Sequence, residues 1–416
     1  MFKTVSVSLV LAVTCFTATG VAHADVVTDW NGHTLRCVQG GPGVPANRSG
    51  PVGLLDIALV QAAVHDAVQA IEGRYEAYRY SNPNLLGAGS TNAAAASASY
   101  RMLVGLYGAD DLCLVGVPDP SLTYAGDGGL QAGNEAAAVM LPLHRPTFVS
   151  PIDPFFGGTE PGQWRPTPNV TMAANTFMAY TEPFTLNSTR QFRPQPPPPM
   201  VSEIYTREYN EVKSLGSETG SSRSIPQHDL ALFWFTNPIS AWFGTLRGIS
   251  MANMTNVGDS ARLFALAGMA AADAQMTVYE TKAHYNFWRP ITAIWFGDDD
   301  GNPNTAGDPT WKPLMQTPPY ADHSSGACSL ASSILSTVEL VLGTDAVNFS
   351  ISSSTVGLLT NPRQYSSLSS ALDDIVEVRI LQGIHFRSAD IEGRRQGARV
   401  AHWAYQGFLR PLPGTR

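Results

Sequence analysis

The run Lys282-Ala-His-Tyr-Asn-Phe-Trp-Arg289-Pro290 decides the fold of this chain of 416 residues. Its pattern predicts a helix that carries Lys282 and Arg289 on one face, two turns apart, and that stops or bends at Pro290. Only 14% of all residues are charged, so two cations on one face are an unusual use of charge. They indicate a pocket for a multiply charged oxyanion such as phosphate or vanadate. A solvated helix end beside an acidic neighbour is the plainer alternative.

A second segment, Pro318-Pro-Tyr-Ala-Asp-His-Ser-Ser325-Gly326-Ala327, leads into a predicted helix at Cys328. A Ser-Ser-Gly turn that opens a helix presents free backbone N–H groups and the positive end of the helix dipole, and both bind anions. Ser325 adds a hydroxyl donor. Because serine is also a common helix cap, this segment is weakly informative by itself.

A third segment runs from Arg379 through Gly383 and His385 to Asp390. Gly383 is expected to interrupt the helix, so His385 need not keep a helical spacing from Arg379. Burying a histidine beside a cation is costly, and a bound oxyanion between them would relieve the repulsion. A neutral His385 can attack phosphorus or coordinate a metal-oxo centre. A core histidine at a helix end is the alternative.

In this order, the three segments resemble the superfamily of vanadium-dependent haloperoxidases and type 2 phosphatidic acid phosphatases. The family signature is Lys-X6-Arg-Pro, then Pro-Ser-Gly-His, then Ser-Arg-X5-His-X3-Asp. The first part matches fully at Lys282, Arg289 and Pro290. The Arg-X5-His part matches at Arg379 and His385. The resemblance implies an all-α fold of helical bundles of the vanadium chloroperoxidase and acid phosphatase type.

The resemblance also implies a role for each matching residue. His385 would be the vanadium ligand of a haloperoxidase or the phosphohistidine nucleophile of a phosphatase. The same cage would bind vanadate or phosphate as cofactor or substrate group, because vanadate resembles the trigonal-bipyramidal state of phosphoryl transfer. The implied oxyanion-binding and catalytic set is Lys282, Arg289, Ser325, Gly326, Arg379 and His385.

One departure from the signature bears directly on activity. Ala327 stands where the family has its acid/base histidine, and losing a general acid/base typically lowers the rate by ~10²–10⁴. His323, in the turn ahead of the helix, is a candidate substitute. His284 is a weaker one, because on a regular helix it points away from Lys282.

Milder departures surround the other motif residues. Ser324 replaces a proline, and Val378 replaces a serine. Ala389 replaces the aspartate expected four residues after the histidine, and Asp390 comes one residue late. The sequence therefore leaves the role of Asp390 in orienting His385 in doubt.

Three functional hypotheses follow. The leading one is a haloperoxidase that oxidises halide with hydrogen peroxide at a vanadate bound to His385 and halogenates a small organic acceptor. The second is a secreted acid phosphatase that acts on phosphomonoesters through a phosphohistidine at the same residue. The third is a degenerate or vanadium-independent relative, which Ala327 favours.

The N-terminal residues predict export. Lys3 precedes a mostly apolar run from Val7 to Phe16, and Ala22-His-Ala24 supplies the small residues of a cleavage site, so residues 1–24 read as a signal peptide. We expect a secreted or periplasmic protein without a transmembrane segment in the mature chain. The formal net charge is −8 and no basic stripe is visible, which argues against a nucleic-acid partner. Oligomeric state is open.

The mature chain, 25–416, is predicted to be one haloperoxidase-like helical domain. It comprises an N-terminal helical half at about 50–145, a Pro-rich connection at about 146–200 and an oxyanion-binding core at about 225–410. Residues 25–50 look irregular, and a disulfide between Cys37 and Cys113 is possible in an oxidising compartment. Helical patterns cover residues 53–72, 91–106, 129–142, 201–215, 227–236, 258–281, 328–342, 367–383 and 390–407.

Overall fold

A computed structural model describes residues 25–48, 50–143, 157–168 and 170–414. The predicted signal peptide, residues 1–24, and part of the Pro-rich connection lie outside the described residues. The described chain is mostly helical, as predicted, and its strands β1 (Phe349–Ile351) and β2 (Arg363–Tyr365) form one antiparallel pair. The α-helices are α1 (Val26–Gln39), α2 (Gly53–Glu72), α3 (Thr91–Tyr107), α4 (Pro120–Thr123), α5 (Gly129–Met140), α6 (Glu203–Leu215), α7 (Ile225–Phe233), α8 (Pro238–Asn253), α9 (Val257–Tyr285), α10 (Pro290–Trp295), α11 (Gly326–Leu342), α12 (Leu368–Leu381) and α13 (Arg387–Gly407). Short 3₁₀ helices lie between them, η1 (Gly50–Val52), η2 (Pro83–Leu85), η3 (Leu112–Leu114), η4 (Leu141–Leu143), η5 (Thr176–Tyr180) and η6 (Gly297–Asp299).

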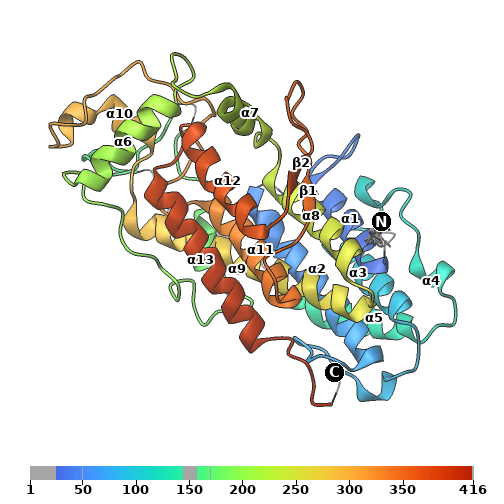
Figure 1. Cartoon of the computed structure of the whole chain (residues 1–416). Helices are drawn as coiled ribbons and strands as arrows, with labels where there is room; N and C mark the ends of the chain where they lie inside the picture. Colours follow the sequence, from blue (N-terminus) through green and yellow to red (C-terminus); the bar gives the residue numbers. More distant parts are fainter. Residues whose placement is uncertain (1–24, 49, 144–156, 169, 415–416) are drawn as a thin grey trace, which may run out of the picture.

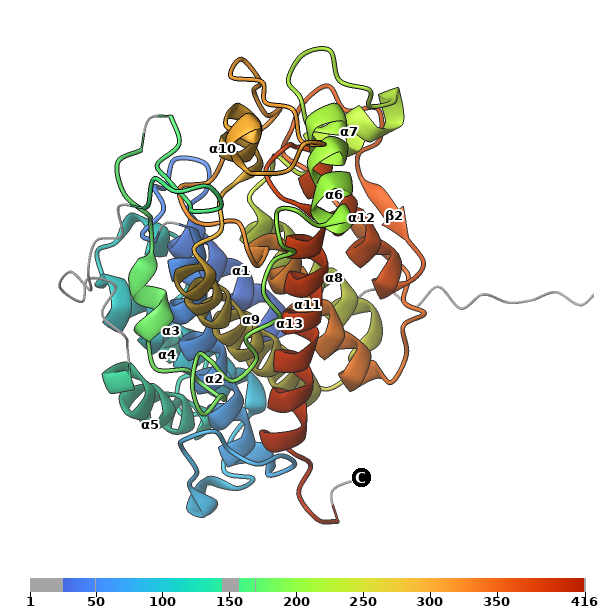
Figure 2. The same cartoon turned by 90° about the vertical axis from the view of Figure 1, so that its left-hand side faces the viewer.

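The long helix α9 forms the centre of the molecule. It packs against α2, which in turn packs on α3 and α5, and it also packs against α11 and α13. Figures 1 and 2 show these two groups of helices on either side of α9. Almost every side chain of α9 as far as Lys282 is buried. A helix that is buried all round belongs to a core, and here it brings Lys282 into the interior.

Helix α2 is also a core helix, although its sequence has the character of a membrane span. Residues Gly50–Glu72 are long and apolar enough to cross a bilayer, and this whole window is buried inside the protein. Residues Gly50–Glu72 thus meet the length and composition of a membrane span, although the mature chain was expected to have no transmembrane segment. Length and hydropathy alone do not distinguish a buried core helix from a membrane helix.

The start of α11 is fixed by a close approach of α13. A Cβ atom added at Gly393 of α13 would lie 2.3 Å from the carbonyl oxygen of Ser325. The Ser325 N–H donates to the carbonyl of Ala389, at 2.9 Å. Only glycine permits this contact, so α13 holds the Ser-Gly turn in place.

The other helix predictions were mostly confirmed, but α1, α8 and the short helices α4 and α10 were not foreseen. Residues 25–50 were expected to be irregular, but α1 begins at Val26, after the N-cap residue Asp25, which forms a capping box with Thr28. Helix α8 was also missed; it begins at an Asn237 cap followed by a proline. The disulfide between Cys37 and Cys113 is present and ties the end of α1 to η3.

Candidate oxyanion and catalytic site

The two cations of the first motif do not share a helix, which corrects the sequence prediction. Helix α9 ends at Tyr285, because Asn286 adopts a left-handed conformation with φ of 48°. Arg289 then caps α10, and Pro290 is its first residue. Both cations still reach one backbone segment. Lys282 Nζ donates to the carbonyls of residues 321 and 322, at 2.6 and 2.9 Å, and Arg289 Nε donates to that of residue 320, at 2.8 Å.

His385 lies against the Arg289 guanidinium, whereas the third motif predicted a place beside Arg379. Gly383 has a φ of 78° and turns the chain after α12, so His385 precedes α13 in a loop. Arg289 Nη1 donates to the Ile384 carbonyl at 2.7 Å and lies 3.0 Å from His385 Nε2. Burial, with help from Arg289 and Lys282, holds the pKa of His385 well below its usual value. The ring is therefore neutral at physiological pH.

Asp322 is the site residue that the sequence analysis missed. Its Oδ1 lies 2.8 Å from His385 Nδ1 and 3.7 Å from Arg289 Nη1, and the side chain is 1% exposed. Burial raises its pKa to about 7, although the charges of Arg289 and Lys282 act to lower it. The only sequence signal was its place just ahead of the Ser-Ser-Gly turn. Asp322 thus takes the position beside His385 that the family signature gives to a later aspartate.

Asp390, on α13, lies away from His385 and against the start of α11. Cys328 Sγ is 3.4 Å from Asp390 Oδ1. Burial raises the pKa of Asp390 well above its usual value, while interaction with the Ser325 hydroxyl and the charge of Arg379 lower it. Ser325 is the N-cap residue of α11, but its side chain makes no capping hydrogen bond. Asp390 therefore contacts Cys328 rather than His385.

The remaining predicted residues meet at a cavity of about 270 Å³. Gly326, Arg379 and His385 all line it, and Ala327 lines it at the position where the family has its acid/base histidine. Arg379 Nη1 donates to Gln382 Oε1, at 2.7 Å. Three of the six predicted residues thus share this space, and Arg289 contacts His385 from outside the lining.

The two candidate substitutes for the missing acid/base are placed differently. His323 lies in the turn ahead of α11, as expected, but it is buried, and its Nε2 lies 2.8 Å from the Gln195 carbonyl. Burial lowers its pKa to about 4. This contact shows that the Pro-rich segment passes over the second motif. His284 is exposed beside Tyr285 and Arg193, away from the cavity.

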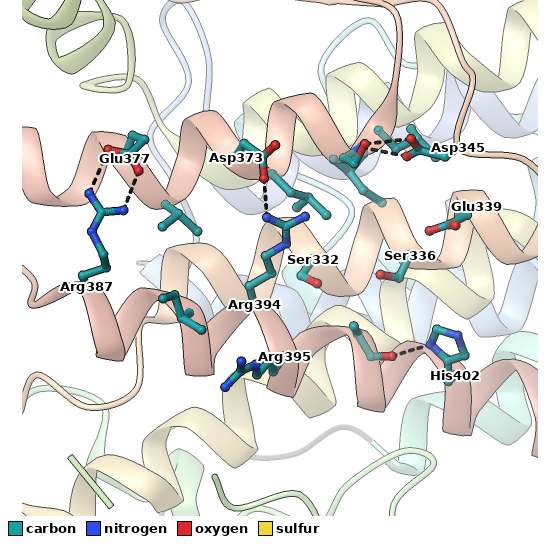
Figure 3. A pocket seen from close by; sticks show the side chains of 17 residues that line it. Ser332, Ser336, Glu339, Asp345, Asp373, Glu377, Arg387, Arg394, Arg395 and His402 are labelled. Atoms are coloured by element: carbon teal, nitrogen blue, oxygen red, sulfur yellow. Dashed lines mark hydrogen bonds and ion pairs between the residues drawn. The ribbon is translucent and has the colours of Figure 1, made fainter. Parts of the chain in front are cut away.

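A larger hollow of about 830 Å³ lies between α11, α12 and α13, and Figure 3 shows its side chains. Its arginines are paired with carboxylates, including Arg395 with Glu392. Arg387 contacts Glu377, and Arg394 contacts Asp373. Because these cations are already neutralised by carboxylates, this groove lacks the charge that an oxyanion site requires.

The cage itself fits a tetrahedral oxyanion. Among the described residues, Arg289 Nη2 and Arg379 Nε are buried and have no hydrogen-bond partner. Buried donors are rarely left unpaired, and the oxygens of vanadate or phosphate would supply the acceptors. The neutral ring of His385 is the form that ligates a metal. The residues present can therefore hold the group that the resemblance implies.

Known proteins are similar to this chain in both sequence and fold. Residues 262–414 match the family model described as the VCPO second helical-bundle domain. Vanadium chloroperoxidase from Curvularia inaequalis is 24% identical, over 82% of this chain and 71% of that protein. A structure described as the first bacterial vanadium-dependent iodoperoxidase superposes with a TM-score of 0.75 at 22% identity, covering 94% of this chain and 97% of that one. The holo form of a bacterial vanadium-dependent chloroperoxidase gives a TM-score of 0.65 at 15% identity, over 86% and 92% of the two chains.

Residues 262–414 are thus similar to the second helical-bundle domain of vanadium chloroperoxidase, and the whole chain has a fold similar to that of vanadium haloperoxidases. The region that matches the family model contains all three signature segments, from Lys282 to His385. The haloperoxidase-like fold extends over the N-terminal helices as well, because the structural similarity covers nearly the whole chain. The three signature segments thus lie in the matched part, and the N-terminal helices pack against it through α2 and α9.

Proposed function

We propose that this protein is an exported, vanadate-dependent haloperoxidase that uses hydrogen peroxide to oxidise a halide. The observation that carries the proposal is the pair of buried, unpartnered donors, Arg289 Nη2 and Arg379 Nε, beside the neutral ring of His385. Similarity to vanadium haloperoxidases supports vanadate as the oxyanion. Export rests on residues 1–24, which have the sequence of a signal peptide.

Three cations would hold the oxyanion. Lys282 uses two of its three ammonium N–H groups on backbone carbonyls and keeps one for a ligand. Arg289 and Arg379 each keep a guanidinium N–H. Such charge-assisted hydrogen bonds are about twice as strong as neutral ones. Gly326, at the first turn of α11, adds the positive end of a helix.

Asp322 would control the ring of His385. When its carboxylate is ionised, the single ring proton is held at Nδ1, 2.8 Å from Asp322 Oδ1, and Nε2 is unprotonated and accepts from Arg289 Nη1 at 3.0 Å, a contact that a ligand would replace. Nε2 is then the ligand atom. Bound vanadate would supply the centre at which peroxide is activated for halide oxidation.

Ala327 limits what the site can do with protons. A methyl group at this position can neither give nor take a proton, so the reaction has to rely on solvent for that step. We therefore expect a slow enzyme that prefers iodide, the most easily oxidised of the halides tested, over bromide.

The test is an assay of iodide and bromide oxidation by the purified mature protein, with hydrogen peroxide and with or without orthovanadate. We expect activity that depends on orthovanadate and that is lost in His385→Ala, together with vanadate binding measured by calorimetry. His402→Ala, which changes an exposed histidine on α13, is the matched control and should keep activity. Halide oxidation that is absent, or that survives in His385→Ala, would contradict the proposal.

The effect of orthovanadate also distinguishes a haloperoxidase from a phosphatase. The three cations and an unprotonated Nε2 of His385 also suit phosphoryl transfer, and a site without a leaving-group acid at Ala327 favours aryl phosphates. Orthovanadate should inhibit a phosphatase and activate a haloperoxidase. Hydrolysis of an aryl phosphate that is blocked by orthovanadate, without halide oxidation, would assign the chain to the phosphatase class.

A further inference from the structure

The cavity beside His385 has the lining of an organic substrate site. Its inner wall is apolar and buried: Leu54, Trp234, Ile239, Leu330 and Ile375 are each no more than 4% exposed. An oxyanion cage alone needs no such wall. Small-molecule sites are typically apolar clefts with a few polar groups, and this cavity has that composition.

The cavity opens to solvent and reaches the cage. Gly50, Asn237 and Pro238 line it and are exposed, so they mark the mouth. His385 and Arg379 line the same space, so it extends to the candidate oxyanion site. A molecule that enters at the mouth therefore comes into contact with the residues that would hold the oxidising centre.

Ala327 makes room for such a molecule. It lies in the first turn of α11 and lines the cavity. An imidazole at this position would fill part of the space beside His385. The change that removes the family's acid/base thus also enlarges an apolar chamber next to the site.

The polar atoms of the wall indicate what the occupant carries. Among the described residues, the indole N–H of Trp234 is buried without a hydrogen-bond partner, and so is Nε of Arg379. Both are donors, so a ligand oxygen would satisfy them. Cationic ligands are disfavoured by Lys282, Arg289 and Arg379. The apolar wall suits an aromatic ring, and about one or two rings fill a cavity of about 270 Å³.

We propose that this cavity binds a small neutral phenol and that halogenation takes place inside it. The inference rests on the proposed haloperoxidase function. With iodide, the overall reaction is H₂O₂ + I⁻ + H⁺ + ArH → ArI + 2 H₂O. Peroxide is reduced, iodide is oxidised by two electrons, a carbon–iodine bond replaces a ring carbon–hydrogen bond, and the displaced ring proton ends in water. An electron-rich ring is the carbon nucleophile that electrophilic iodine requires.

The first experiment measures binding and does not depend on activity. p-Cresol is titrated by calorimetry into the full mature chain without vanadate. Ile239→Trp fills the inner wall, and Ile225→Trp makes the same change at a residue of α7 that is 75% exposed. We expect one saturable site in the wild type and in Ile225→Trp, and affinity at least tenfold weaker in Ile239→Trp. Ala327→Leu, which adds volume at a partly exposed helical position, should weaken binding too and serves if Ile239→Trp does not fold.

The second experiment measures iodination of p-cresol by the vanadate-loaded protein. The rate should saturate with p-cresol. A p-cresol concentration at half-maximal rate that is at least tenfold higher in Ile239→Trp or Ala327→Leu supports halogenation in the cavity. No saturable binding, or equal binding in all variants, overturns the inference even if iodide oxidation depends on vanadate. Saturable binding without vanadate-dependent oxidation overturns the proposed function instead, and with it the halogenation step, while leaving the phenol site.

Discussion

Replacing Asp322 with asparagine should change how stability depends on pH. Burial raises the pKa of Asp322 from 3.8 to about 7, so the folded protein keeps a proton that the unfolded chain has lost. A raised carboxyl pKa contributes stability that is fully present below the unfolded value and is lost as pH rises through the folded value. At about 1.4 kcal/mol for each pH unit, the wild type should lose roughly 3–4 kcal/mol of unfolding free energy between pH 4 and pH 8 through this group.

The asparagine variant cannot titrate at this position, so its unfolding free energy should rise relative to wild type by that amount over the same range. Urea unfolding of oxyanion-free protein at several pH values measures the difference, and other titrating groups cancel in it. Asp373→Asn, at an exposed carboxylate of α12 that pairs with Arg394, is the control and should give a much flatter difference. A flat difference for Asp322→Asn would refute the reasoning. A difference that falls with pH would show that Arg289 and Lys282 outweigh burial.

The remaining predictions concern the missing histidine, the disulfide and the helix contact. Ala327→His should raise vanadate-dependent iodide oxidation by ~10²–10⁴ if an acid/base limits the rate, and an unchanged kcat/KM would contradict this. Replacing Cys37 and Cys113 with alanine should lower the unfolding free energy by about 2–5 kcal/mol in urea, and equal stability would show that the bridge does not form in solution. Gly393→Ala should cost about 1–3 kcal/mol, since its Cβ would lie 2.3 Å from a carbonyl of the Ser-Gly turn. Gly407→Ala on the same helix has nothing within 4 Å of its Cβ and is the control in thermal unfolding.

The sequence predicted most of the fold because the core helices have a strong local pattern. Helix α9 and helix α2 are rich in Ala and Leu and are buried, so composition and periodicity were sufficient to find them. The end of α9 before Asn286 was missed, because asparagine can adopt either a helical or a left-handed conformation and its presence in the sequence does not show which. Helix α1 was missed because glycines near Cys37 suggested an irregular segment.

The site was predicted where motifs carry it and missed where tertiary contact decides it. Lys282, Arg289, Arg379 and His385 were found because the family signature fixes their spacing. Asp322 has no spacing rule to His385, and only the packing of the second motif onto the third brings their side chains to 2.8 Å. The sequence showed that the expected aspartate stands one residue late, at position 390. It did not show that Asp390 contacts Cys328 of α11.

The charge of Asp322 has two opposing effects on the site. Its ionised form places the ring proton on Nδ1 and leaves Nε2 of His385 unprotonated, so that a ligand could replace the Arg289 contact there, whereas its protonated form would donate to Nδ1 and move the ring proton to Nε2. The ionised form also repels an incoming oxyanion. Three buried or partly buried cations offset this repulsion. Burial, with help from Arg289, lowers the pKa of Lys282 well below its usual value, but while Lys282 is protonated the three cations outnumber the acids Asp322 and Asp390, even with both carboxylates ionised. With only two cations, an ionised Asp322 would hold the proton of His385 correctly but would weaken anion binding. The third cation offsets this repulsion, so that both conditions can be met.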